Sequence, residues 1–211
     1  MAQPLKIAVL LSGGGRTLAN LTEHMASEHL PIQIVLVVSS NSKAYGLKLA
    51  ADLGFKSLTL NPKDYTDQAQ YSQQLFDQLR SARAELVCLA GWLWLLEIPD
   101  DFAHRVVNIH PALLPSFGGT GMYGHHVHGA VLAAGCKISG CTVHFADQTY
   151  DTGPIIVQRT CKVREDDTPD SLASRVFEQE CIAYPQALRL IAQRHVRIEG
   201  RCTRIRQSCR A

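Results

Sequence analysis

The sequence predicts an α/β fold with a mostly parallel, twisted sheet flanked by helices and an antiparallel pair of strands in its C-terminal half. Two observations lead to this prediction. Through residues 5–90, short apolar runs alternate with longer segments in which apolar residues recur at helical spacing, a pattern typical of β-α-β units. Between residues 137 and 163, two strand-like runs follow each other with only a short connection, and connections that short join antiparallel strands.

The N-terminal half is expected to supply the parallel strands and the helices that connect them. The expected strands are short apolar runs at residues 5–11, 32–38, 56–60 and 86–90. The last run is apolar throughout, so it is expected to be the central strand. The expected helices carry apolar residues at helical spacing and lie at residues 17–27, 44–53 and 67–83.

The pattern changes after Val106. The glycine-rich residues 116–128 are predicted to form a loop, residues 127–134 to begin a helix, and residues 137–145 and 153–163 to form the antiparallel strands. Pro169 is expected near the first turn of a helix over residues 171–192, with a kink possible at Pro185. The arginine-rich residues 194–210 are expected to be a solvated edge strand and a frayed terminus rather than an RNA-binding tail.

Length and composition favour one globular domain over residues 1–211. Its expected parts are a phosphate-binding half to about residue 105, a catalytic half to about residue 198, and a basic tail. The net charge of +2 is too small to favour nucleic acid or a membrane as partner. The seven cysteines are an odd number without a Cys-x-x-Cys pair, and no secretory signal is visible. Reduced, mostly buried thiols and a cytoplasmic location are therefore expected.

Three polar residues provide the groups that transfer at a carbonyl carbon requires: Asn108, His110 and Asp151. An amide can hold a developing oxyanion, an imidazole can move a proton, and a carboxylate can orient and charge the imidazole. No Gly-x-Ser-x-Gly elbow occurs in the chain. His110 is therefore predicted to transfer protons rather than to activate a nucleophile of the protein.

Two other motifs each allow two interpretations. The run Ser12-Gly13-Gly14-Gly15 follows a strand and opens a helix, so it is either a phosphate site at a helix N-terminus or a simple tight turn. The histidines of the glycine-rich loop fit a polar cleft better than a metal site, and His144 is either a core histidine or part of the site. The loop histidines are His125, His126 and His128.

At these motifs the chain resembles the folate-dependent formyltransferase family, and within it the enzymes that formylate glycinamide ribonucleotide. The resemblance covers about residues 5–198 and includes Leu89-Ala90-Gly91-Trp92, Asn108-Ile109-His110-Pro111, Thr142-Val143-His144-Phe145 and Asp151-Thr152-Gly153-Pro154. It implies the formyltransferase fold, Rossmann-like in its N-terminal half. It also implies formyl transfer from 10-formyltetrahydrofolate to the amine of glycinamide ribonucleotide in purine synthesis, without a metal or a covalent intermediate.

The resemblance also implies a role for each site residue. Asn108 would hold the formyl oxygen, His110 would act as a cation or proton donor, and Asp151 would raise the pKa of His110. The ribonucleotide would be bound by Gly15, Arg16, Thr17 and Glu180. The folate would be bound by Leu93, Trp94, Leu95, Leu96, Asn108, Asp147 and Asp151. Trp94 and Gln68 stand where family members often carry arginine, so fewer cations are expected near the folate tail.

The same residues leave two alternative activities, which are hydrolysis of formyl-folate and formyl transfer to another small amine. The first strand begins almost at the N-terminus, which argues against the regulatory domain that family hydrolases usually carry. The expected partners are the two small substrates alone, with no nucleic acid and no membrane, and the expected state is a monomer or homodimer.

Overall fold

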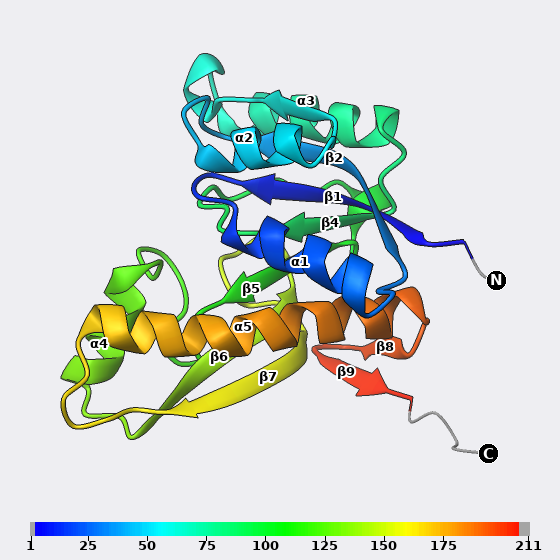
Figure 1. Ribbon diagram of the computed structural model, residues 1–211. Helices are drawn as coiled ribbons and strands as arrows, with labels where there is room; N and C mark the ends of the chain where they lie inside the picture. The colour runs from blue at the N-terminus through cyan, green and yellow to red at the C-terminus, as the bar shows by residue number, and fades with distance from the viewer. Residues whose placement is uncertain (1–2, 207–211) are drawn as a thin grey trace. The chain divides into compact units, whose positions relative to one another are not determined.

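The structure is a computed structural model that describes residues 3–206, and its main sheet has seven strands in the order β3-β2-β1-β4-β5-β6-β7 (Figure 1). All pairings from β3 to β5 are parallel, whereas β6 and β7 are antiparallel, as predicted. β4 is the central strand, also as predicted. The strands are β1 (Leu5–Leu11), β2 (Ile32–Ser39), β3 (Ser57–Thr59), β4 (Leu86–Leu89), β5 (Val106–His110), β6 (Ile138–Phe145) and β7 (Ile155–Lys162).

The chain forms two compact units that divide after Asn108. In the first unit, strands alternate with α1 (Arg16–Ser27), α2 (Tyr45–Asp52) and α3 (Gln68–Ser81), which confirms the predicted helices to within two residues at each end. Asp67 caps α3 by accepting a hydrogen bond from the amide of Gln70 at 2.8 Å. The core of this unit is the interior of β1 and β4, where Ile7, Val9 and Val87 are fully buried.

The second unit contains α4 (His125–Ala133), the antiparallel pair β6 and β7, and the long helix α5 (Pro169–Ala192), which packs along both strands (Figure 1). Thr168 caps α5, and Pro169 lies in its first turn, as predicted, although the helix begins two residues before the predicted start at Ser171. The helix continues through Pro185. Arg175 of this helix donates two hydrogen bonds of 2.6 and 2.9 Å to Asp167, which lies just before the helix, and these bonds fix the turn that enters it.

Three sequence-based expectations were wrong in part. The predicted loop over residues 116–128 ends at Gly124, because α4 begins at His125 and buries Val127 and His128. The basic tail forms the hairpin of β8 (Val196–Glu199) and β9 (Cys202–Ile205) rather than a single edge strand, since Gly200 adopts the positive φ of 61° at its turn. The cysteines are free where described, but only Cys88 and Cys141 are buried. Cys209 and the last residues of the tail lie outside the described residues.

Candidate active site

In the first unit, the glycine-rich segment after β1 forms an open turn against two neighbouring segments. The amide of Ser12 donates to the carbonyl of Gly91 at 3.2 Å, and the carbonyl of Gly13 accepts from the amide of Gly46 at 3.0 Å. Gly15 has a φ of 74°, and a Cβ there would lie 2.8 Å from the Cα of Gly46. A side chain is therefore excluded at Gly15 by both backbone conformation and space.

The start of α1 is suited to an anion. Gly15 is its N-cap and, as a glycine, supplies no side-chain hydrogen bond to the first turn of the helix. Gly13 and Gly14 are exposed, and a Cβ built on either would meet no atom within 4 Å. Open glycines beside uncapped helical amides are what a phosphate needs. The predicted ribonucleotide residues Gly15, Arg16 and Thr17 are all located here.

The segment predicted to bind the pterin follows β4, the strand beside β1. The side chains of Leu93 and Trp94 are 49% and 42% exposed, whereas Leu96 is buried. The hydrogen bond between Ser12 and Gly91 joins this segment to the glycine turn. Both predicted binding segments of the first unit thus meet at the carboxyl ends of parallel strands, where open α/β sheets bind ligands.

Asn108 and His110 lie two residues apart on β5. Side chains alternate along a strand, so both project from the same face of β5. The strand alone therefore places the amide and the imidazole side by side. Asp151, in contrast, is brought to His110 only by the fold of the second unit.

Within the second unit, His110 and Asp151 form a buried pair. The imidazole Nδ1 lies 3.4 Å from the carboxylate Oδ2, and the two side chains are 4% and 8% exposed. The same Oδ2 accepts a hydrogen bond from the amide of Gly119 at 2.9 Å. The Nε2 of His144 lies 3.5 Å from the other carboxylate oxygen. The predicted pairing of His110 with Asp151 is thus present, and His144 belongs to the site rather than to the core alone.

His110 contacts an acceptor at each ring nitrogen. Its Nε2 lies 2.8 Å from the carbonyl oxygen of Phe117, while Nδ1 faces Asp151. Only the imidazolium has a proton for both contacts. Neither nitrogen contacts a serine, threonine or cysteine of the described residues, so the site has no activated hydroxyl or thiol at His110.

Burial and charge act in opposite directions on this pair. Burial lowers the pKa of His110 below its ordinary value, and the Asp151 charge and the Phe117 carbonyl only partly offset that effect. The resemblance had implied that Asp151 raises this pKa, and Asp151 does act in that direction, but the cost of desolvating the cation is larger. For Asp151, burial raises the pKa, but His144 and His110 together lower it below its usual range. The carboxylate is therefore ionised.

The remaining predicted residues have distinct surroundings. Asp147 accepts from the amide of Thr149 and the hydroxyl of Thr152, at 3.0 and 2.7 Å, so it shapes the loop that carries Asp151. Glu180 lies on α5; burial raises the pKa of Cys141 to about 12, and the charge of Glu180 acts in the same direction. In the described part of the chain, no group of histidine, cysteine and acidic side chains is arranged to hold a metal.

Sequence reasoning missed the backbone groups that complete the site. The Phe117 carbonyl and the Gly119 amide both belong to the loop that follows Pro115, and the chain's fold alone brings them to His110 and Asp151. The glycines at 118 and 119 were the available signal. A Cβ at Gly118 would lie 3.1 Å from that of Asp151.

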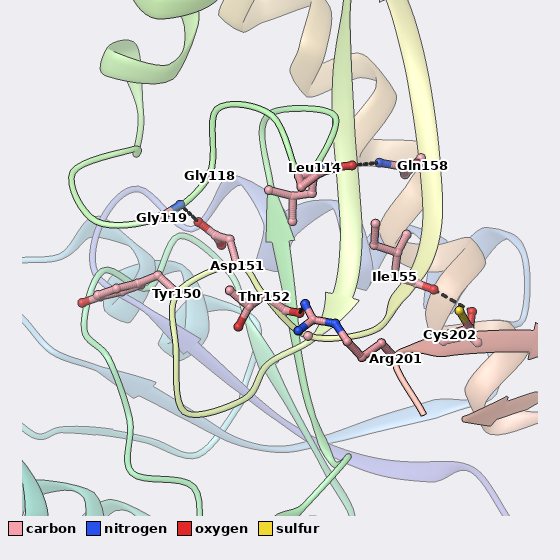
Figure 2. Close-up of a pocket in the computed structure, with 13 residues that line it drawn as sticks. Leu114, Gly118, Gly119, Tyr150, Asp151, Thr152, Ile155, Gln158, Arg201 and Cys202 are labelled. Atoms are coloured by element: carbon pink, nitrogen blue, oxygen red, sulfur yellow. Dashed lines mark hydrogen bonds between the residues drawn. The ribbon is translucent and has the colours of Figure 1, made fainter. Parts of the chain in front are cut away.

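A cavity of about 590 Å³ lies beside Asp151 in the second unit (Figure 2). Its walls come from the loop around Leu114, the loop of Asp151, the start of β7 and the C-terminal hairpin. The lining residues include Leu114, Tyr150, Asp151, Ile155, Gln158 and Arg201. The cavity is large enough for part of a drug-sized ligand and combines apolar walls with a few polar groups.

Comparison with known proteins identifies the family. The formyl transferase family model matches residues 5–188. The chain belongs to the formyl transferase family. It is 36% identical over 195 residues to the chloroplastic phosphoribosylglycinamide formyltransferase of Arabidopsis thaliana, covering 91% of this chain and 67% of that protein. It is 39% identical over 190 residues to the trifunctional purine biosynthetic protein adenosine-3 of Drosophila melanogaster.

The family fold is also clear from solved structures. The crystal structure of glycinamide ribonucleotide transformylase 1 from Symbiobacterium toebii matches with a TM-score of 0.92 and 35% identity, covering 98% of this chain and 96% of that chain. The predicted formyltransferase fold is thereby confirmed. The match with the Drosophila protein covers 88% of this chain but only 14% of that longer relative.

Proposed function

We propose that this protein transfers the formyl group of 10-formyltetrahydrofolate to the amine of glycinamide ribonucleotide, giving the N-formyl ribonucleotide and tetrahydrofolate in purine synthesis. The observation that carries the proposal is the buried His110–Asp151 pair, in which His110 contacts no nucleophilic side chain among the described residues. The relatives from Arabidopsis and Symbiobacterium, whose names describe this activity, support the choice of substrates.

The proposed reaction is a direct transfer through a tetrahedral intermediate. The ribonucleotide amine forms a bond to the formyl carbon, and the carbonyl electron pair moves to oxygen. Asn108 donates to that oxyanion through its amide. The amine nitrogen then gives up a proton to water. The oxyanion electron pair re-forms the carbonyl as the bond from carbon to the folate nitrogen breaks, and that nitrogen leaves with a proton from His110.

The surroundings of His110 support its role as the proton donor. Asp151 occupies Nδ1, so the proton is delivered from Nε2, where a substrate atom replaces the Phe117 carbonyl. Burial destabilises the imidazolium while Asp151 stabilises it. Because burial outweighs the stabilisation by Asp151, the imidazolium gives up its proton more readily than it would in an ion pair whose attraction fully offset the cost of burial.

The binding roles follow the positions of the residues in each unit. We assign the ribonucleotide phosphate to Gly15, Arg16 and Thr17, where the uncapped amides of α1 begin. Glu180 suits the glycinamide ammonium because it carries the opposite charge. For the folate, we assign the pterin to the segments around residues 93–96 and 147–151, together with Asn108.

The remaining proposals concern partners and location. We infer that the two small substrates are the only partners required for catalysis and that the protein acts as a monomer or homodimer. Free cysteines are consistent with a cytoplasmic enzyme. In the described residues, no helix is long and apolar enough to cross a membrane.

The deciding experiment follows deformylation of 10-formyltetrahydrofolate by absorbance, with and without glycinamide ribonucleotide. Turnover that requires the ribonucleotide, with the formylated product seen by mass spectrometry, is expected. Equal turnover without any amine would instead identify a hydrolase. Turnover with glycinamide or another small amine, but not faster with the ribonucleotide, would identify a different acceptor.

A further inference from the structure

The C-terminal hairpin of β8 and β9 is bonded to the segment that carries Asp151. The guanidinium Nη2 of Arg201 donates to the carbonyl of Thr152 at 3.0 Å. The hydroxyl of Thr203 donates to the carbonyl of Ile155 at 2.6 Å. These contacts join residues 49 and 48 positions apart in sequence. Figure 2 shows the first of them directly beside Asp151.

The Asp151 loop holds its charged residue in an uncommon conformation. Asp151 has a φ of 58°, in the left-handed region that non-glycine residues seldom occupy. At its start, Asp147 bonds Thr149 and Thr152 within the loop. At its end, the amide of Phe145 donates to the carbonyl of Pro154 at 2.9 Å. The loop carbonyl next to Asp151 is the one that Arg201 holds.

We propose that the C-terminal hairpin is a positioning element for Asp151, with Arg201 and Thr203 as its two positioning residues. The hairpin fixes Thr152 and Ile155, on the C-terminal side of Asp151, while the internal bonds of Asp147 fix the N-terminal side. The carboxylate is thereby kept at the distance from His110 and His144 that the structure shows.

The position of the hairpin gives it a second effect on the same site. Arg201, Cys202 and Thr203 line the cavity that Asp151 also lines. Arg201 is the only cationic side chain among the described residues that line it. Loss of the hairpin contacts therefore opens one wall of the cavity as well as releasing the loop.

The catalytic consequence of this inference rests on the proposed function, whereas the structural contact does not. Misplacement of a catalytic group by about 1 Å can cost about a hundredfold in rate. Arg201 is exposed and the loop keeps its internal bonds. We therefore expect a loss of about tenfold in kcat when its contact is removed, which is smaller than that full effect.

The test uses pairs of variants in the full-length protein. Arg201→Ala and Thr203→Val remove the two donors, and Arg201→Lys and Thr203→Ser restore a donor at each position. Arg197→Ala is the control, because Arg197 lies on the same hairpin but its contact is with Glu199 at 3.6 Å. We expect kcat to fall in the first two variants, to recover in the conservative ones, and to be unchanged in the control.

Hydrogen–deuterium exchange separates this inference from the activity. Arg201→Ala should increase exchange in the peptide that contains residues 147–154, with an unchanged melting temperature and unchanged exchange in α5. If exchange and kcat both match the wild type, the hairpin does not position Asp151. If the wild type itself transfers no formyl group, the proposed function fails, but the exchange result still decides whether the hairpin holds the loop.

Discussion

At the scale of single residues, the buried pair of His110 and Asp151 carries the proposed chemistry. We expect His110→Ala and Asp151→Asn each to lower turnover by at least about a hundredfold, as loss of a general acid or its partner typically does. Asparagine is the informative replacement at Asp151, because it tolerates the φ of 58° and keeps the side-chain shape while it removes the charge and one of the two acceptor oxygens. Steady-state kinetics at saturating substrates measures the effect, and near-full activity in either variant would exclude that residue from the assigned role.

The absence of a side chain at Gly15 is needed for stability, whereas Gly13 and Gly14 have room for one. Gly15→Ala places a Cβ against the backbone of Gly46 at a φ of 74°, whereas Gly13→Ala meets no atom within 4 Å. We expect the first change to lower the free energy of unfolding by about 2 kcal/mol or more. Urea unfolding measures both variants, and equal stabilities would show that the turn can relax around a methyl group.

At the scale of elements, the turn between β1 and α1 is the proposed phosphate site. The double variant Arg16→Gln and Thr17→Val should raise the apparent KM for glycinamide ribonucleotide by about tenfold or more, because a charge-assisted contact to phosphate is lost. The KM for folate should change much less. Arg105→Gln, which removes an exposed cation just before β5, is the matched control. A larger effect on folate than on the ribonucleotide contradicts the placement.

At the scale of the whole molecule, burial of His128 couples stability to pH. Burial lowers the pKa of His128 from 6.5 to about 4, and the charges of His125 and His110 act in the same direction. Above pH 6.5 this histidine is neutral whether the chain is folded or unfolded. As pH falls from 6.5 to 4, only the unfolded chain takes up the proton, so stability is lost.

The predicted loss over this interval is up to about 3 kcal/mol, at about 1.4 kcal/mol per pKa unit. Thermal unfolding measured from pH 7 to pH 4 should show a shallower decline for His128→Gln than for the wild type. His126→Gln, at an exposed position on the same helix, should follow the wild type. Parallel declines in all three proteins would assign the acid sensitivity to other groups, including His110.

Much of the architecture was determined by local sequence. The apolar run of β1 and the Thr168-Pro169 start of α5 are encoded by neighbouring residues, and both elements form where predicted. The start of α4 was predicted two residues late, at residue 127 rather than at His125. α4 starts after Gly124 with two exposed histidines, and burial of its inner face by the rest of the unit decides where it begins.

The sequence by itself determined that the proposed reacting groups of β5 lie together, because an amide and an imidazole two residues apart on a strand share a face. Only the tertiary structure decided what those groups contact. The Phe117 carbonyl, the Gly119 amide and the hairpin donor of Arg201 come from other segments of the chain, and only the glycines at 118 and 119 gave a signal in the sequence. The protonation balance of His110 was likewise decided by burial, which depends on packing around the residue rather than on its neighbours in the chain.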